Sequence, residues 1–105
     1  MAILVIHAPQ WREEKENARS FESTIRLGVG DGYAIYKYLV DQLTPRCGVV
    51  IICKDKMERA EGILNKLVPT ETTRNGIQRY DVHIDNIKPV AYKRERLNRC
   101  GVAVI

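Results

Sequence analysis

The chain contains 105 residues, 45% of them hydrophobic and 29% charged, so it has the composition of one folded domain, and we expect a single domain over residues 1–105. No apolar run reaches the roughly 20 residues that a helix needs to cross a bilayer, which argues against a membrane partner. The net charge is +4 and unevenly distributed along the chain, which favours polyanionic partners.

The first half of the chain begins with a short apolar segment and continues through polar and glycine-rich stretches. Residues 2–8 are apolar and β-branched, which predicts a buried strand. Residues 10–24 are polar and rich in helix formers, and we interpret them as a short helix or an ordered loop. The glycines of residues 26–32 predict a loop. Asp31 then suits the N-cap of a helix over residues 32–43.

The middle of the chain holds one clear strand and one ambiguous segment. Residues 47–55 form a continuous Val- and Ile-rich run, which predicts a central strand buried on both faces. Residues 57–68 fit a helix by the spacing of their apolar side chains. However, Gly62 in the middle of this segment favours a bent strand from about residue 60 to residue 68.

The strongest local signal is the dipeptide Asn75-Gly76, which is typical of a tight hairpin turn. Residues 77–85 alternate strictly, which predicts a strand whose core face carries Tyr80, Val82 and Ile84. If the dipeptide closes a hairpin, residues 60–68 must be the partner strand, and this decides the choice in favour of a strand. We further expect an edge strand or corner over residues 87–93 and a last apolar strand over residues 100–105.

These elements predict an α+β fold, with a small, mostly antiparallel barrel of five or six strands and one or two helices. The segments "CGVVIICKD", "AEGILNKLVP" and "GIQRYDVHIDNIKPVAYK" follow one another within residues 45–92. In this order they resemble the PUA-like superfamily of small pseudo-barrels, which includes the EVE, ASCH and YTH domains. The resemblance implies binding of RNA, or recognition of a modified base in RNA or DNA, by an aromatic-lined pocket between the barrel and its helices.

The positive charge is concentrated in the last third of the chain. Residues 74–105 carry seven basic and three acidic side chains, whereas residues 1–73 carry ten of each. This pattern is typical of a nucleic-acid-binding surface, although a solvated basic tail has the same signature. We expect the cations beyond the predicted turn to share one outward wall.

We therefore predict a non-catalytic nucleic-acid-binding protein that grips RNA or DNA, with an extruded or modified base as one form of the ligand. The aromatic residues at loop–helix junctions would sandwich an unstacked base, and the basic residues would hold the backbone. Phe21, Tyr36 and Tyr80 are interpreted as core residues. The candidate binding residues are Trp11, Tyr33, Arg74, Arg79, Lys88 and Arg94.

Other functions stay open at this point. The motif "GVGDG" does not match a nucleotide-binding fingerprint, so we interpret it as a flexible entry to a helix or as the lip of a ligand pocket. The same basic surface could bind an acidic protein partner. His83 and Asp81 share one face of a predicted strand and could serve a small hydrolase or a ligand-binding barrel.

The three cysteines, Cys47, Cys53 and Cys100, lie in or beside apolar segments and form no CxxC pair. We interpret them as reduced core thiols of a cytoplasmic protein. The first residues have the character of a strand and not of a signal peptide. The cysteines and histidines show no recognisable zinc-site spacing, so we predict no metal and no cofactor.

Overall fold

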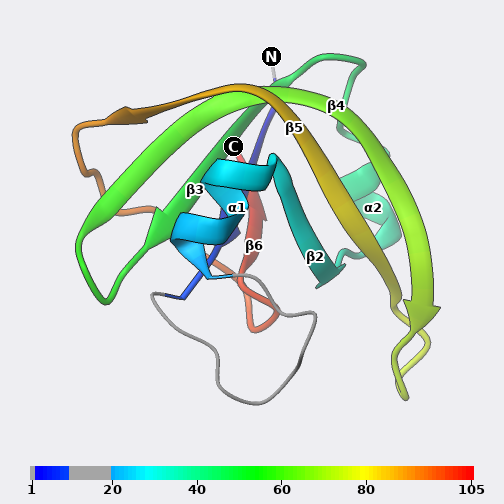
Figure 1. Ribbon diagram of the computed structural model, residues 1–105. Coiled ribbons are helices and arrows are strands. Elements are labelled where there is room, and N and C mark those ends of the chain that lie inside the picture. The colour runs from blue at the N-terminus through cyan, green and yellow to red at the C-terminus, as the bar shows by residue number, and fades with distance from the viewer. Residues whose placement is uncertain (1, 10–19) are drawn as a thin grey trace.

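The computed structural model describes residues 2–9 and 20–105, and in these residues one mixed sheet of six strands curls into a half-barrel around two short helices (Figure 1). The sheet order is β2-β5-β4-β3-β1-β6. All neighbouring strands are antiparallel except β1 and β3, which run parallel. The strands are β1 (Ile3–His7), β2 (Val29–Ala34), β3 (Gly48–Cys53), β4 (Glu58–Thr72), β5 (Gln78–Val90) and β6 (Val102–Val104), and the helices are α1 (Phe21–Leu27) and α2 (Lys37–Val40).

The β4–β5 hairpin confirms the prediction made from Asn75-Gly76. Gly76 has a φ of 81°, which a residue with a side chain rarely adopts, and its N–H donates to the carbonyl of Thr73 at 3.0 Å. The N–H of Thr73 donates to the carbonyl of Ile77 at 2.8 Å and closes the turn. The strand expected over residues 60–68 lies inside β4, so the helical alternative for this segment is wrong.

Gly62 allows the two long strands of the hairpin to approach closely where the sheet bends. A Cβ atom at this position would lie 2.7 Å from Cγ2 of Ile84 and 2.8 Å from the carbonyl oxygen of Asp85. The register between β4 and β5 also shifts between Glu61 and Ile63. Both observations agree with the predicted bend at this glycine, because a missing side chain and an irregular ladder let a strand turn sharply.

The central strand β3 is buried on both faces, as predicted from its unbroken apolar run. Val49, Ile51 and Cys53 belong to the main core, which lies on the concave side of the sheet and includes Phe21 of α1 and Leu39 of α2. Val50 and Ile52 belong to a smaller cluster on the other face, together with Val5 and the partly buried Tyr92 and Leu97. The segment that leads from β5 to β6 therefore covers the back of β3.

The helix expected over residues 32–43 is wrong for its first part, which forms strand β2 and the residues after it. β2 pairs with β5, and the N–H of Ile35 donates to the carbonyl of Gln78 at 3.2 Å. Only residues 37–40 are helical. The long edge of β5 offers unpaired backbone groups to this segment, and such a tertiary contact overrides local helix propensity.

The glycine-rich stretch expected to be a loop also contains the end of a helix. Gly28 ends α1 with a φ of 71°, and its N–H donates to the carbonyl of Thr24 at 2.8 Å. The helix begins after Ser20, whose Oγ accepts from the N–H of Ser23 at 3.2 Å. Residues 10–19 of the segment expected as helix or loop lie outside the described residues.

The α+β, barrel-like character is confirmed in coarse terms, but the parallel β1–β3 pair makes the sheet mixed. The predicted strands over residues 2–8 and 100–105 correspond to β1 and β6. In the part of the chain that the structure describes, neither helix has the length and apolarity required to span a lipid bilayer.

We predict that Gly62→Ala lowers the free energy of unfolding by about 1–3 kcal/mol, because its methyl group has to displace a backbone carbonyl. The matched control is Gly48→Ala, whose new Cβ would meet Ile3 at an ordinary 3.5 Å. This control should be neutral or stabilising by up to about 1 kcal/mol. Urea unfolding of both variants measures the difference, and equal effects would contradict the close approach of the strands.

Candidate nucleic-acid interface

The two edges of the half-barrel meet where β2 faces β1 and β6, and we call this line the seam. The hydroxyl of Tyr33 in β2 donates to the carbonyl of His7 in β1 at 2.8 Å. A Cβ atom at Gly30 would lie 3.1 Å from Cδ1 of Ile6, so the two edges also touch through apolar atoms. The half-barrel is therefore closed here by side chains and not by a strand ladder.

A polar pocket of about 400 Å³ opens at the seam, and we call it the seam pocket. Its walls come from β2, from β5, from the end of β1 and from the turn before β6. These segments are far apart in the sequence and meet only because the sheet curls. The lining residues are His7, Asp31, Gly32, Tyr33, Ala34, Arg79, Arg99, Cys100 and Gly101.

Two side chains of β5 hold the wall of this pocket in place. The N–H of Gly32 donates to Oδ1 of Asp81 at 3.0 Å, and Nη1 of Arg79 donates to the carbonyl of Gly32 at 2.6 Å. Gly32 has a φ of 70° and lies where the β2–β5 register shifts between Gly30 and Tyr33. The bulge of β2 is therefore fixed through both of its backbone groups, which otherwise would have no ladder partner.

The charge of the seam pocket comes from two guanidinium groups and one carboxylate. Among the described residues, Arg79 uses its guanidinium for a single hydrogen bond, to Gly32, and so keeps further N–H donors for a ligand. Arg99 is exposed and makes no ion pair with any residue that the structure describes. Asp31 contributes the carboxylate. The pocket therefore has a positive balance and can bind an anion.

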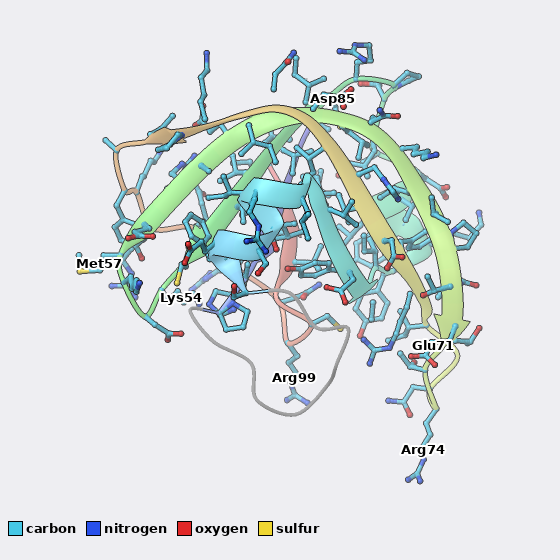
Figure 2. All side chains as sticks on the ribbon, viewed as in Figure 1. Lys54, Met57, Glu71, Arg74, Asp85 and Arg99 are labelled. Carbon is cyan, nitrogen blue, oxygen red and sulfur yellow. The ribbon has the colours of Figure 1, made fainter. Side chains whose placement is uncertain are left out.

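The predicted basic residues do not share one outward wall, so that expectation is wrong. Arg74 lies at the tip of the hairpin, and Figure 2 shows it projecting on the same lower side of the view as Arg99. Arg79 lies near the same end of β5, but Lys88 pairs with Glu61 at the opposite end. Lys88 follows Arg79 by nine positions along the strand, which is about 30 Å of chain.

Arg94 also lies away from the seam pocket, beside residues that surround a buried arginine. The Arg59 side chain is 8% exposed, and its Nη1 donates to the carbonyl of Lys93 and to Oε1 of Glu95, each at 3.0 Å. Arg94 lies between these two partners in the chain and is exposed. Arg94 does not line the seam pocket, and its role in binding stays a prediction.

The aromatic predictions have different outcomes. Tyr33 is only 7% exposed, so its ring forms a pocket wall and part of the core and not an exposed stacking surface. Trp11 lies outside the described residues. Phe21 is buried as predicted, and Tyr80 packs against the core. Tyr36 was expected in the core, but it is 39% exposed and stacks on Tyr38.

Sequence reasoning missed Arg99 and the exposed pair of tyrosines. Arg99 precedes β6 by a short turn, and only the pairing of β6 with β1 brings it to the seam. Tyr36 lies inside the helix predicted over residues 32–43, but in the structure it precedes α2 with an extended backbone, at φ −60° and ψ 142°. The helical spacing that placed it in the core therefore does not apply to it.

A second pocket of about 570 Å³ lies between α1 and the beginning of β4. Its lining includes Arg26 and Lys56 as well as Glu22 and Glu58, so these four charges balance. Arg59 also lines it, but the guanidinium of this residue is already bound to Glu95 and Lys93. This larger pocket is consequently a weaker anion site than the seam pocket.

The alternative catalytic pair finds no support in hydrogen bonding. Oδ1 of Asp81 accepts from Gly32, and within the described ranges no hydrogen bond joins Asp81 to His83. In these ranges no three His, Cys, Asp or Glu side chains gather in a way that could hold a metal ion.

Comparisons with protein-family models, curated proteins and solved structures found no match to this chain. The similarity to the PUA-like superfamily therefore remains a prediction from the short motifs of residues 45–92. The function has to be argued from the geometry of the seam pocket and its surroundings.

We predict that Asp81→Ala lowers the free energy of unfolding by about 1–3 kcal/mol, because the N–H of Gly32 loses its charged acceptor. The matched control is Asp41→Ala. Asp41 pairs with Lys37 at 3.2 Å, but the two side chains are 60% and 89% exposed, so its loss should cost less than about 0.5 kcal/mol. Chemical denaturation of both variants measures the effect, and equal stabilities would show that the bulge needs no side-chain support.

Proposed function

We propose that this protein binds nucleic acid without catalysing a reaction, and that the seam pocket holds phosphate groups of the backbone. The observation that carries the proposal is the convergence of Arg79 and Arg99 on one polar pocket. These residues come from β5 and from the turn before β6, so the fold itself brings two arginines to one pocket. A guanidinium presents planar donors that match the oxygens of a phosphate, often in pairs.

The surroundings of the pocket support a chain-like polyanion as the ligand. Arg74 projects from the hairpin tip on the side of the molecule that also carries Arg99 (Figure 2). A backbone that leaves the seam pocket toward the hairpin tip would therefore meet a third positive charge. Contacts of this kind give affinity through the release of counterions and do not depend on sequence.

The motif resemblance supports the same class of ligand. The PUA-like superfamily implies RNA, or a modified or extruded base in RNA or DNA, and we include these in the proposal. The cysteines Cys47, Cys53 and Cys100 are all free thiols, which supports a reducing, cytoplasmic setting.

We expect Arg99→Gln to weaken binding several-fold in fluorescence polarisation with labelled RNA and DNA, and to lower the slope of log K against log salt by about 0.7 for single strands. The control is Arg94→Gln, which removes the same charge in the segment that follows β5, away from the seam pocket, and should leave both quantities unchanged. Both arginines are exposed, so neither variant should change the fold.

Two results would contradict the proposal. One is a wild-type protein that binds no oligonucleotide at low ionic strength. The other is an equal loss for Arg99→Gln and Arg94→Gln, which would indicate a diffuse attraction and not a pocket. A protein that co-purifies after nuclease treatment, without oligonucleotide binding, would instead support the acidic-partner alternative.

A further inference from the structure

Tyr36 and Tyr38 form an exposed aromatic pair at the start of α2, and we call this pair the tyrosine platform. The ring centroids lie 5.8 Å apart with an interplanar angle of 29°, which is a stacked arrangement. Tyr38 is 63% exposed and Tyr36 is 39% exposed. Within the residues that the structure describes, neither hydroxyl makes a hydrogen bond.

Backbone hydrogen bonds and one buried side chain, Leu39, fix the segment that carries the tyrosine platform. The carbonyl of Tyr36 accepts from the N–H of Leu39 at 2.9 Å and from the N–H of Val40 at 3.1 Å. Leu39 is 8% exposed and belongs to the main core. This helix of four residues is thus anchored through Leu39, and the tyrosine rings remain available on its outer side.

The charges next to the platform suit a polyanion. Lys37 lies between the two tyrosines, and its Nζ is 3.2 Å from Oδ2 of Asp41. With side chains 89% and 60% exposed, this ion pair is weak and a phosphate can replace the carboxylate. Ala34 lines the seam pocket and precedes Tyr38 by four residues, which span no more than about 14 Å.

We propose that the tyrosine platform stacks an unpaired base, and that the protein therefore selects single-stranded nucleic acid over duplex. This inference rests on the proposed binding of phosphate groups at the seam pocket. Inside a duplex both faces of each base are covered by its neighbours, whereas a base in a single strand can offer one face to an aromatic ring. Tyr38 contacts the base, and Tyr36 positions Tyr38 by stacking behind it.

Nucleic acid fits this surface better than a protein partner does. Exposed tyrosines alone occur in protein interfaces as well. Here, however, the platform adjoins Lys37 and continues along the same segment to a pocket that contains Arg79 and Arg99. Aromatic rings beside a cationic track are the arrangement with which single strands are bound irrespective of their sequence.

The test compares a labelled single strand of about ten nucleotides with its duplex in fluorescence polarisation. Tyr38→Leu removes the ring but keeps an apolar side chain, and we expect the affinity for the single strand to fall about 5- to 100-fold. Tyr38→Trp keeps a stacking surface and should hold the affinity within about threefold. The matched control is Met57→Ala, because Met57 is 66% exposed and projects on the opposite side of the molecule in Figure 2.

The outcomes separate this inference from the proposed function. Unchanged affinity of Tyr38→Leu, or equal affinity of the wild-type protein for duplex and single strand, would overturn the tyrosine platform. If Arg99→Gln still lowered the affinity, the proposed role of the seam pocket would stand. If Tyr38→Trp lowers the affinity for the single strand as much as Tyr38→Leu does, base stacking on Tyr38 is also overturned. No binding of either probe overturns both proposals. Far-UV circular dichroism should be the same for all variants, since Tyr38 is exposed.

Discussion

The pairing of β4 with β5 is the constraint on which the rest of this structure depends. These are the two longest strands, and they approach so closely at Gly62 that no side chain fits between them. The approach bends the sheet into a half-barrel, and the concave side becomes the place where α1 and α2 bury their apolar residues. A flat sheet would expose this core and would keep its two edges apart.

The curvature also creates the candidate site. β5 extends far enough to pair with β2 on its other side, and its Arg79 and Asp81 hold the bulge at Gly32 through both backbone groups. The bulge fixes the wall of the seam pocket, and Tyr33 ties β2 to β1. The seam pocket is thus a consequence of how the half-barrel closes. Its position depends on the hydrogen bonds made by Arg79, Asp81 and Tyr33.

Charge and not volume distinguishes the seam pocket from the larger pocket beside α1. The larger one has a balanced rim, and its buried arginine is neutralised by Glu95 and Glu61. A buried guanidinium requires carboxylate partners of this kind, so we assign Arg59 a structural role and not a ligand-binding one. In the seam pocket the guanidinium groups of Arg79 and Arg99 have no carboxylate partner among the described residues, which leaves them for an external anion.

Short-range patterns in the sequence were sufficient to predict a large part of the fold. The apolar runs predicted β1, β3 and β6, and the dipeptide Asn75-Gly76 predicted the hairpin, because backbone conformation and burial on both faces leave direct marks on residue choice. The same signals indicated Gly62 as the bend and Cys53 as a buried thiol. Arg79 was the one predicted cation that the structure places in the seam pocket.

Only the tertiary structure decided the parts that depend on which edges meet. Residues 29–34 have local features of a loop and a helix start, yet they became β2 because the edge of β5 lacked a partner. Arg99 reaches the seam through the pairing of β6 with β1, and Tyr36 is exposed in an extended conformation before α2, which begins only at Lys37. Contacts between residues so distant in the chain leave no periodic pattern in the sequence, and for that reason the composition of the site could not be read from it.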